Sequence, residues 1–451
     1  MDRQLRNDSE YITEKAIKAV MPDEAVKRAL KGLPPVSGRV ILVSVGKAAY
    51  SMAQAAVSYL GISGDAGMYG SIPGRDSGTI RAGCISRGIV ITKYGHVMGE
   101  LPGIECFEAG HPVPDLNGFA ATQAAIDIVS DLTADDMVIF LLSGGGSALF
   151  ERPLVSPNEM MGITRQLLAC GADITEINTI RKRLSGVKGG RFARTCSPAK
   201  VFQIVLSDIV GDPLCMIASG PACVDESTNE EAAAIAEKYS LRLSDKAKQF
   251  LSVETVKKLD NVTTYITGSV RELCKAAENA SRELGYETIF LTDRLSCEAK
   301  DAGIFISDIV KSHEGCGRKI AFIAGGETVV HLDNGKAMQD ADGKESPLGG
   351  RNQELSLAAA KGISGVEGAC VFSIGSDGTD GPTDAAGGYV DHTTIDDAKK
   401  LGISISDTLI AHDSYHALDE LGGLIVTGPT GTNVNDVTVA LLNQENNHKQ
   451  M

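Results

Sequence analysis

The stretch Met137-Val-Ile-Phe-Leu-Leu-Ser-Gly-Gly-Gly-Ser-Ala148 joins an unbroken apolar run to three consecutive glycines. Its apolar part, Met137–Leu142, is short and shows no polar alternation, which is typical of a strand buried on both faces. The glycines that follow predict a tight strand-to-helix turn whose backbone a ligand could approach closely. This stretch therefore predicts a buried strand of an α/β sheet with a candidate ligand site at its end.

The same pattern recurs along most of the chain: a short β-branched run, a turn rich in small polar residues, and an Ala-rich helical stretch. Short apolar runs that alternate with helices indicate a parallel sheet covered on both faces, so the predicted fold class is α/β. The predicted strands are Val40–Val45, Gly88–Thr92, Met137–Leu142, Val201–Leu206, Thr264–Ile266, Thr288–Leu291, Ile320–Ala324, Val371–Ile374 and Leu424–Thr427. The predicted helical stretches include Ala48–Leu60, Asn117–Ser130 and Ser269–Leu284.

Length and local composition indicate more than one domain. At about 100–200 residues per domain, a chain of 451 residues predicts two or three. The polar, charge-mixed segment Asp225–Asn261 predicts helices without a strand, and Tyr265–Asp293 then begins a new strand–helix–strand unit. We therefore expect an N-terminal α/β domain over residues 1–240 and a C-terminal α/β domain over residues 241–451.

The composition narrows the range of partners and compartments. A formal net charge of −15, with Lys and Arg scattered, argues against nucleic acid or an anionic membrane surface as the main partner. The ten cysteines form no Cys-x-x-Cys pair, which favours free thiols in a reducing compartment. The segment Met1–Glu10 lacks the apolar region of a signal peptide, and no apolar run approaches the ~18 residues of a membrane span. We therefore expect a soluble cytoplasmic protein, and the sequence leaves the oligomeric state open, a homodimer included.

The loops after the predicted strands are the candidate functional sites, because ligands of open α/β sheets bind at the carboxyl ends of the strands. Three adjacent glycines leave backbone N–H groups unobstructed, which suits a phosphate or a carboxylate. The alternative is a tight turn without a ligand. The candidate anion-binding residues of this loop are Ser143, Gly144, Gly145, Gly146 and Ser147.

Three charged residues stand in other loops of the N-terminal half. Lys47 lies between the first predicted strand and an Ala-rich helix, where it could contact an anion; a solvated lysine is the alternative. Lys188 lies among three glycines in Ser185–Arg191, as a candidate anion contact or as part of a basic helix end. Asp208 ends another strand, where it could hold Mg²⁺ or accept a hydroxyl proton, or serve as a turn or cap residue.

Glycine-rich segments of the C-terminal half contain further candidates. Arg351 follows two glycines and precedes a predicted helix over Asn352–Lys361, so its planar fork is a candidate clamp for a phosphate or a carboxylate. A structural pair with Glu354 is the alternative. The acidic loop Gly375–Gly388 suits Mg²⁺ or a sugar hydroxyl, or is an elaborate turn. Together with Gly325–Thr328, these segments add Glu327, Asn352, Asp377 and Asp380 to the candidate binding residues.

Several common motifs are missing from the sequence. It contains no Walker A loop and no Gly-x-Gly-x-x-Gly fingerprint, which weakens an interpretation as a dehydrogenase. It also contains no Gly-x-Ser-x-Gly elbow and no His-x-x-x-His pair, so neither a serine hydrolase nor a zinc enzyme is expected.

Taken together, these segments resemble the type II glycerate 2-kinase family, whose C-terminal part is the MOFRL domain. Each matching piece is short, but their order and joint presence extend over most of the chain. In chain order they are Ser44-Val-Gly-Lys47, Leu142-Ser-Gly-Gly-Gly-Ser147, Lys188-Gly-Gly190, Ser207-Asp208, Gly325-Gly-Glu-Thr328, Gly349-Gly-Arg-Asn-Gln-Glu354, Gly375-Ser-Asp-Gly378 and Asp380-Gly-Pro-Thr-Asp-Ala-Ala-Gly387.

The resemblance implies two Rossmann-like, three-layer αβα domains with the active site in the cleft between them, and a MOFRL region in the C-terminal domain. It implies ATP- and Mg²⁺-dependent phosphorylation of D-glycerate on its 2-hydroxyl, which gives 2-phospho-D-glycerate and ADP. By position, Lys47 and Arg351 are then the central active-site cations, and Asp208 is the candidate base or Mg²⁺ ligand. The alternatives are a kinase for another small sugar acid, an NAD(P)H-dependent hydroxypyruvate reductase, and a non-catalytic sensor of sugar acids or nucleotides.

Overall fold

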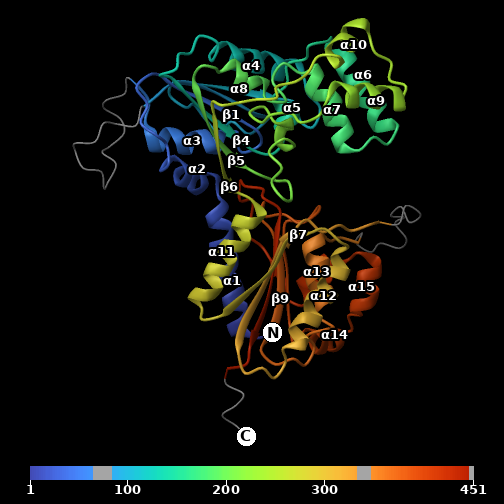
Figure 1. Cartoon of the computed structure of the whole chain (residues 1–451). Coiled ribbons are helices and arrows are strands. Elements are labelled where there is room, and N and C mark those ends of the chain that lie inside the picture. Colours follow the sequence, from blue (N-terminus) through green and yellow to red (C-terminus); the bar gives the residue numbers. More distant parts are fainter. Residues whose placement is uncertain (64–83, 333–346, 446–451) are drawn as a thin grey trace, which may run out of the picture. The chain divides into compact units, whose positions relative to one another are not determined.

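The structure is a computed structural model of the chain that describes residues 1–63, 84–332 and 347–445 (Figure 1). The chain divides into two compact units. Pro22–Thr267 form the first, which we call the parallel-sheet unit, and Met1–Met21 together with Gly268–Met451 form the second, the mixed-sheet unit. Within the described ranges, every helix is too short or too polar to cross a membrane.

In the residues that the structure describes, the parallel-sheet unit is built on six strands in the order β3-β2-β1-β4-β5-β6. They are β1 (Val40–Val45), β2 (Ile85–Lys93), β3 (Ile104–Ala109), β4 (Met137–Leu142), β5 (Lys200–Leu206) and β6 (Val262–Gly268). β1 and β4 pair in parallel at the centre, and β2, β3 and β5 continue the parallel pairing on either side. Both central strands are buried along their whole length, so the expected parallel α/β sheet is confirmed for this unit.

Helices cover both faces of this sheet because alternate side chains of each strand point in opposite directions. Val43 packs in the core on the side of Ala121 in α4, and Leu42 packs in the core on the side of Met52 in α3. The helices of the unit are α2 (Pro22–Leu30), α3 (Ala49–Leu60), α4 (Leu116–Asp127), α5 (Gly146–Leu149), α6 (Pro157–Ala169), α7 (Ile174–Leu184), α8 (Arg191–Thr195), the short 3₁₀-helix η1 (Ile217–Ser219), α9 (Asn229–Lys238) and α10 (Asp245–Leu251). Of these, α6, α7, α9 and α10 pack on one another around a small core of their own (Figure 1).

The described part of the mixed-sheet unit also has six strands, in the order β11-β10-β9-β12-β8-β7. They are β7 (Glu287–Leu295), β8 (Lys319–Gly326), β9 (Ala369–Gly375), β10 (Gly387–Asp391), β11 (Leu424–Ile425) and β12 (Asp436–Asn443). Figure 1 shows α1 and α11 on one face of this sheet and α12 and α13 on the other. The helices are α1 (Arg3–Val20), α11 (Val270–Glu283), α12 (Ala299–Ser312), α13 (Arg351–Ala359), α14 (Thr394–Leu401), α15 (Ile405–Ala411) and α16 (Ser414–Glu420).

The expectation of parallel sheets fails for the mixed-sheet unit. Only β7 and β8 pair in parallel among its strands, whereas β12 runs antiparallel to both of its neighbours, β8 and β9, in the described part of the chain. β10 is antiparallel to β9 and to β11. Apolar periodicity indicates that a strand is buried on both faces, but it carries no information about the direction of the strands beside it.

Three strands are missing from the sequence-based prediction, each for a local reason. β3 is Ile-Glu-Cys-Phe-Glu-Ala, and its two glutamates reflect its place at the edge of the sheet. β10 begins with two glycines and therefore contains no apolar run. β12 directly follows the polar residues 428–435 and was not predicted, although it is one of the two central strands of its sheet.

The division into units differs from the expected boundary between residues 240 and 241. α10 packs against α7, and the N–H of Val201 donates to the carbonyl of Asn261, so residues 241–267 belong to the parallel-sheet unit. The new strand–helix–strand unit that we expected is also divided, because β6 joins the first sheet and β7 joins the second. The first 21 residues pack with the C-terminal half, where the hydroxyl of Tyr286 donates to Asp8 at 2.7 Å.

Candidate active site

The glycine turn after β4 is tied to the end of β1. The two strands pair side by side, with Val45 opposite Leu142. The N–H of Lys47 donates to the carbonyl of Gly144 at 2.8 Å, and the N–H of Ala48 donates to Oγ of Ser143 at 3.1 Å. Ser143 is only 3% exposed, and its hydroxyl links the ends of the two strands by accepting the hydrogen bond from Ala48. The turn and Lys47 therefore form one rigid corner of the sheet.

The glycines of this turn make room for ionisable side chains from three other strand ends. A Cβ on Gly145 would lie 3.1 Å from Cγ of Lys47 and 3.1 Å from Cδ2 of His111. A Cβ on Gly144 would lie 2.1 Å from Oδ2 of Asp208. Lys47 follows β1, His111 follows β3 and Asp208 follows β5, so the carboxyl edge of the parallel sheet brings all three to one turn.

His111 is the member of this group that the sequence did not reveal. It follows β3, which the sequence pattern did not predict, and it lies outside every glycine-rich loop that we singled out. Burial lowers the pKa of its imidazole, and the positive charges of Lys47 and Lys93 lower it further. The imidazole is therefore neutral at pH 7 and is able to accept a proton or a hydrogen bond.

The glycine turn opens into the short helix α5, in which the N–H groups of Ala148 and Leu149 donate to the carbonyl of Gly145. Gly145 adopts a left-handed conformation with φ +84°, which allows the chain to enter the helix directly from the strand. The hydroxyl of Ser147 contacts that of Ser219 at 3.1 Å, and Ser219 donates to Oδ1 of Asn178 at 3.0 Å. Ser147 thus belongs to an internal chain of polar contacts.

Lys188 is fully buried, at 0% exposure, and contacts the backbone of α5 and of the residue that follows it. Its ammonium donates to the carbonyls of Ser147 and Phe150, both at 3.0 Å, and forms an ion pair with Glu151 at 2.9 Å. Burial lowers the pKa of Lys188 to about 8, although Glu151 opposes the shift. A direct contact between this ammonium and a ligand would require one of these three interactions to break.

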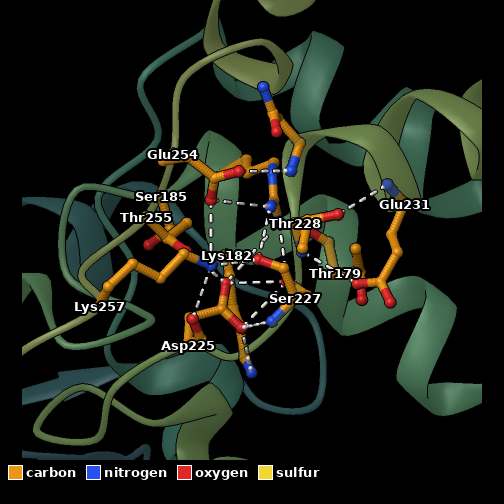
Figure 2. A network of polar contacts seen from close by, with 12 residues as sticks. Thr179, Lys182, Ser185, Asp225, Ser227, Thr228, Glu231, Glu254, Thr255 and Lys257 are labelled. Atoms are coloured by element: carbon orange, nitrogen blue, oxygen red, sulfur yellow. Dashed lines mark hydrogen bonds and ion pairs between the residues drawn. The ribbon is translucent and has the colours of Figure 1, made fainter.

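A second buried network holds α7, the helix that leads into the segment carrying Lys188 (Figure 2). Lys182 pairs with Asp225 at 3.2 Å, and Arg183, which is fully buried, lies 3.7 Å from the same carboxylate. Thr255 and Ser227 also donate to Asp225. This network fixes the C-terminal end of α7 and therefore the start of the Ser185–Arg191 loop.

In the mixed-sheet unit, Arg351 is the first residue of α13. Gly350 before it supplies no side-chain cap. The cap comes instead from Asp380, whose carboxylate accepts from the N–H groups of Asn352 at 3.2 Å and Gln353 at 2.8 Å. Asp380 is 2% exposed, and burial raises its pKa to about 7. This carboxylate is committed to positioning α13.

The guanidinium of Arg351 contacts two carboxylates. Nε donates to Oδ2 of Asp436 at 2.6 Å, Nη2 donates to Oδ1 of Asp436 at 3.0 Å, and Nη1 donates to Oε1 of Glu327 at 3.0 Å. The alternative of a pair between Arg351 and Glu354 is wrong, because Glu354 points elsewhere and contacts Nδ1 of His412 at 2.9 Å. Asp436 is not among the residues expected from the sequence, because it begins β12, a strand that the sequence pattern did not predict.

The remaining candidates of this unit lie near Arg351 but face the protein interior or a turn. Asn352 is 1% exposed, and its Oδ1 accepts from Oγ of Ser373 at 2.6 Å. Oδ1 of Asp377 accepts from the N–H of Thr379 at 3.1 Å and so shapes the loop after β9. Glu327, with 47% of its side chain exposed, is the open member of the group.

Comparisons with known proteins agree over nearly the whole chain. A family model described as a domain of unknown function (DUF4147) matches residues 8–252, and the MOFRL family model matches residues 320–436. The D-glycerate 2-kinase of Thermotoga maritima is 46% identical over 437 residues, which cover 96% of this chain and 97% of that protein. A putative hydroxypyruvate reductase of Agrobacterium vitis is 36% identical, over 96% of this chain and 93% of its own length. The crystal structure of glycerate kinase from Thermotoga maritima matches with a TM-score of 0.87 and 45% identity, over 98% of this chain and 100% of that chain. This chain therefore belongs to the type II glycerate kinase family.

Proposed function

We propose that this protein is an ATP-dependent kinase that phosphorylates D-glycerate on its 2-hydroxyl, giving 2-phospho-D-glycerate and ADP. The relative that is 46% identical is named D-glycerate 2-kinase, and the similar solved structure is named glycerate kinase. Both similarities extend over the parallel-sheet unit and the mixed-sheet unit.

The observation that carries the proposal is the group of ionisable side chains at the glycine turn. Phosphoryl transfer asks a protein mainly to position two substrates and to neutralise the charge on the transferring group. Lys47 supplies a positive charge beside the turn, and the N–H groups of Gly144, Gly145 and Gly146 are the proposed donors to an anionic oxygen. We assign these groups to an anionic part of the nucleotide or of glycerate.

Asp208 is the proposed Mg²⁺ ligand or the proposed acceptor of the 2-hydroxyl proton. Mg²⁺ is usually held by one or two carboxylates together with substrate phosphates and water, and a single carboxylate beside an anion-binding turn fits that donor set. In the described ranges, no three His, Cys, Asp or Glu side chains are grouped so as to hold a metal. Nucleotide phosphates would therefore supply much of the coordination, and the ion would neutralise their charge.

Arg351 is the proposed second cation of the reaction. Its planar fork suits the oxygens of a phosphate or a carboxylate. Among the other candidates, Glu327 and Asp377 have exposed or half-buried side chains that could contact a substrate. We assign Ser143, Ser147, Lys188, Asn352 and Asp380 to shaping the two loops, since their polar atoms have internal partners.

The test is incubation with ATP, Mg²⁺ and D-glycerate, followed by phosphorus NMR of the product. We expect 2-phosphoglycerate and ADP in equal amounts. Formation of 3-phosphoglycerate, or no ADP, would overturn the proposal. L-glycerate and other small sugar acids, tested in the same way, distinguish a kinase for another substrate.

Hydroxypyruvate reduction is the second candidate, because a relative that is 36% identical bears that name. It predicts oxidation of NADH or NADPH by hydroxypyruvate without ATP. The chain lacks the dinucleotide fingerprint, so we expect no such oxidation. In a single preparation, a fall in the absorbance of the reduced nicotinamide detects the reductase, and formation of ADP detects the kinase.

Replacement of Lys47 by Ala tests its role in the kinase reaction. We expect kcat to fall by about 100-fold or more, as for loss of a preorganised donor to a developing charge. Lys258→Ala is the matched control, since this lysine is exposed. Near-native turnover in a folded Lys47→Ala variant would remove the lysine from the mechanism.

The proposed setting of the reaction is the cytoplasm. All ten cysteines are free thiols in the structure, which fits a reducing compartment. The proposed partners are two small molecules, ATP and D-glycerate.

A further inference from the structure

Asp436 stands at a rigid point of the mixed-sheet unit. It is the first residue of β12, one of the two central strands, and it pairs with Gly326 of β8 on one side and with Gly375 of β9 on the other. Its exposed fraction is 4%. The backbone of Asp436 is hydrogen-bonded to strands on both sides and its side chain is buried, so the position of its carboxylate is fixed.

The contact between Asp436 and Arg351 fixes a plane as well as a distance. Two parallel hydrogen bonds, of 2.6 Å and 3.0 Å, join the Nε–Nη2 edge of the guanidinium to both carboxylate oxygens. Such bidentate pairs restrict the orientation of the guanidinium, whereas a single contact leaves it free to rotate. The backbone of Arg351 is held separately, because Asp380 caps the first turn of α13. Both ends of this long side chain are thus anchored from different strands and loops.

The pairing leaves part of the guanidinium available. Arginine has five N–H groups. Within the described part of the chain, Asp436 accepts from two of them and Glu327 accepts from one, and a third of the Arg351 side chain (33%) is exposed. The remaining N–H groups belong to Nη1 and Nη2, the end of the fork that suits a phosphate or a carboxylate.

Asp436 also compensates for the partial burial of the Arg351 guanidinium. Burial by itself lowers the pKa of Arg351, but the hydrogen bond and the negative charge of Asp436 raise it above its ordinary value. Glu327 contributes less to this fixed environment, because it makes a single hydrogen bond and its side chain is 47% exposed.

We propose that Asp436 is the positioning residue for Arg351: it fixes the plane of the guanidinium so that the free end of the fork meets an anionic substrate group. The inference rests on the proposed kinase function. Asp436 touches no reacting atom, and its effect on the reaction rate passes entirely through Arg351.

The first test is Asp436→Asn, which keeps the shape and removes the charge and one acceptor. We expect kcat to fall by about 10- to 100-fold, because a misdirected guanidinium loses contacts that matter in the transition state. We expect KM for ATP to change less than kcat, and thermal unfolding to remain a single transition near that of the wild type. A kcat within twofold of the wild type would overturn the proposal.

The second test is chemical rescue, which a merely structural role of Asp436 would not affect. Arg351→Ala leaves a gap in front of the Asp436 carboxylate, and free guanidinium ion at millimolar concentration should bind there and restore part of kcat. The double variant Arg351→Ala/Asp436→Asn should fold, by circular dichroism, and should show no rescue. Arg351→Ala/Glu327→Gln should still be rescued. Equal rescue with and without Asp436 would overturn the proposal.

A third measurement separates this inference from the kinase proposal. Nitrogen NMR of arginine-labelled protein should show a slowly exchanging Nε–H resonance for Arg351 in the wild type, lost in Asp436→Asn. If the wild type makes no ADP from ATP and D-glycerate, the proposed function fails, and the loss of this resonance still decides whether Asp436 fixes Arg351. A resonance unchanged by the substitution would refute the positioning role whatever the activity is.

Discussion

The buried Lys188 provides the sharpest quantitative prediction, because its three contacts all lie inside the protein. In the variant Lys188→Met, a side chain of similar length replaces the ammonium and leaves the Glu151 carboxylate at 1% exposure without its partner at 2.9 Å. The carbonyl of Phe150 also loses this donor, whereas that of Ser147 keeps the hydrogen bond from Nη2 of Arg181 at 2.9 Å. The perturbation therefore removes one charge from a buried pair and loosens α5 at the same time.

The expected cost follows from these contacts. Removing one partner of a buried ion pair typically costs about 3–5 kcal/mol, and a typical domain has a total stability of only about 5–15 kcal/mol. Arg181, 3.9 Å from the same carboxylate, offsets a minor part of the loss. The double variant Lys188→Met/Glu151→Leu removes the unpaired charge, so it should be more stable than Lys188→Met by about 2 kcal/mol.

Urea unfolding followed by far-ultraviolet circular dichroism measures both values, since the chain contains no tryptophan to serve as a fluorescent probe. A cost below about 1 kcal/mol for Lys188→Met, or a double variant no more stable than the single one, would refute the reasoning. Kinase activity then separates two roles. A stable double variant that retains turnover identifies Lys188 as a support of α5, whereas a stable but inactive one restores it as a ligand contact.

Two further predictions concern a glycine and a buried carboxyl. Gly145→Ala introduces a Cβ at φ +84°, 3.1 Å from the Lys47 and His111 side chains, whereas the Cβ of the control Gly402→Ala, at φ +75°, meets nothing within 4 Å. Both variants should lose about 1–2 kcal/mol of stability, because an L side chain is strained at positive φ. Only Gly145→Ala should lose activity in the kinase assay. Equal activity losses would contradict this. The pKa of Asp380 is raised from 3.8 to about 7, so its contribution to stability is full below about pH 4 and is lost as the pH rises through 7. The stability of the wild type relative to Asp380→Asn should therefore fall by about 2–3 kcal/mol between about pH 5 and about pH 7 in urea titrations, and a pH-independent difference would contradict the shift.

Much of the parallel-sheet unit could be predicted from local patterns. β1 and β4 are apolar on both faces, and the residue pattern shows this without any knowledge of their neighbours. Lys47, Asp208 and the glycine turn could be brought together in advance because each follows a predicted strand, and the carboxyl ends of parallel strands lie on one edge. Here a single physical rule connects local sequence to the site.

The mixed-sheet unit could be predicted less well, because most of its strands are not parallel and no such rule places their ends on one edge. The direction and order of its strands depend on contacts between distant segments, and β12, which lies far along the chain from both partners, pairs between β8 and β9. The assignment of α1 to this unit likewise rests on contacts such as that between Asp8 and Tyr286, 278 positions apart. Local periodicity carries no record of such pairings.

By itself, the sequence determined the α/β class, the turns that could meet an anion and the charged residues worth testing. Only the tertiary structure decided what those residues do. Lys188 and Asp380 are candidate ligand contacts in the sequence, and the structure shows that Lys188 contacts the backbone of α5 and that Asp380 caps α13. Arg351 acquires its anchor from Asp436, 85 positions away, and His111 joins Lys47 at the turn. A side chain's role depends on the partners that satisfy its charge and hydrogen bonds, and the folded topology, rather than the neighbouring residues, supplies those partners.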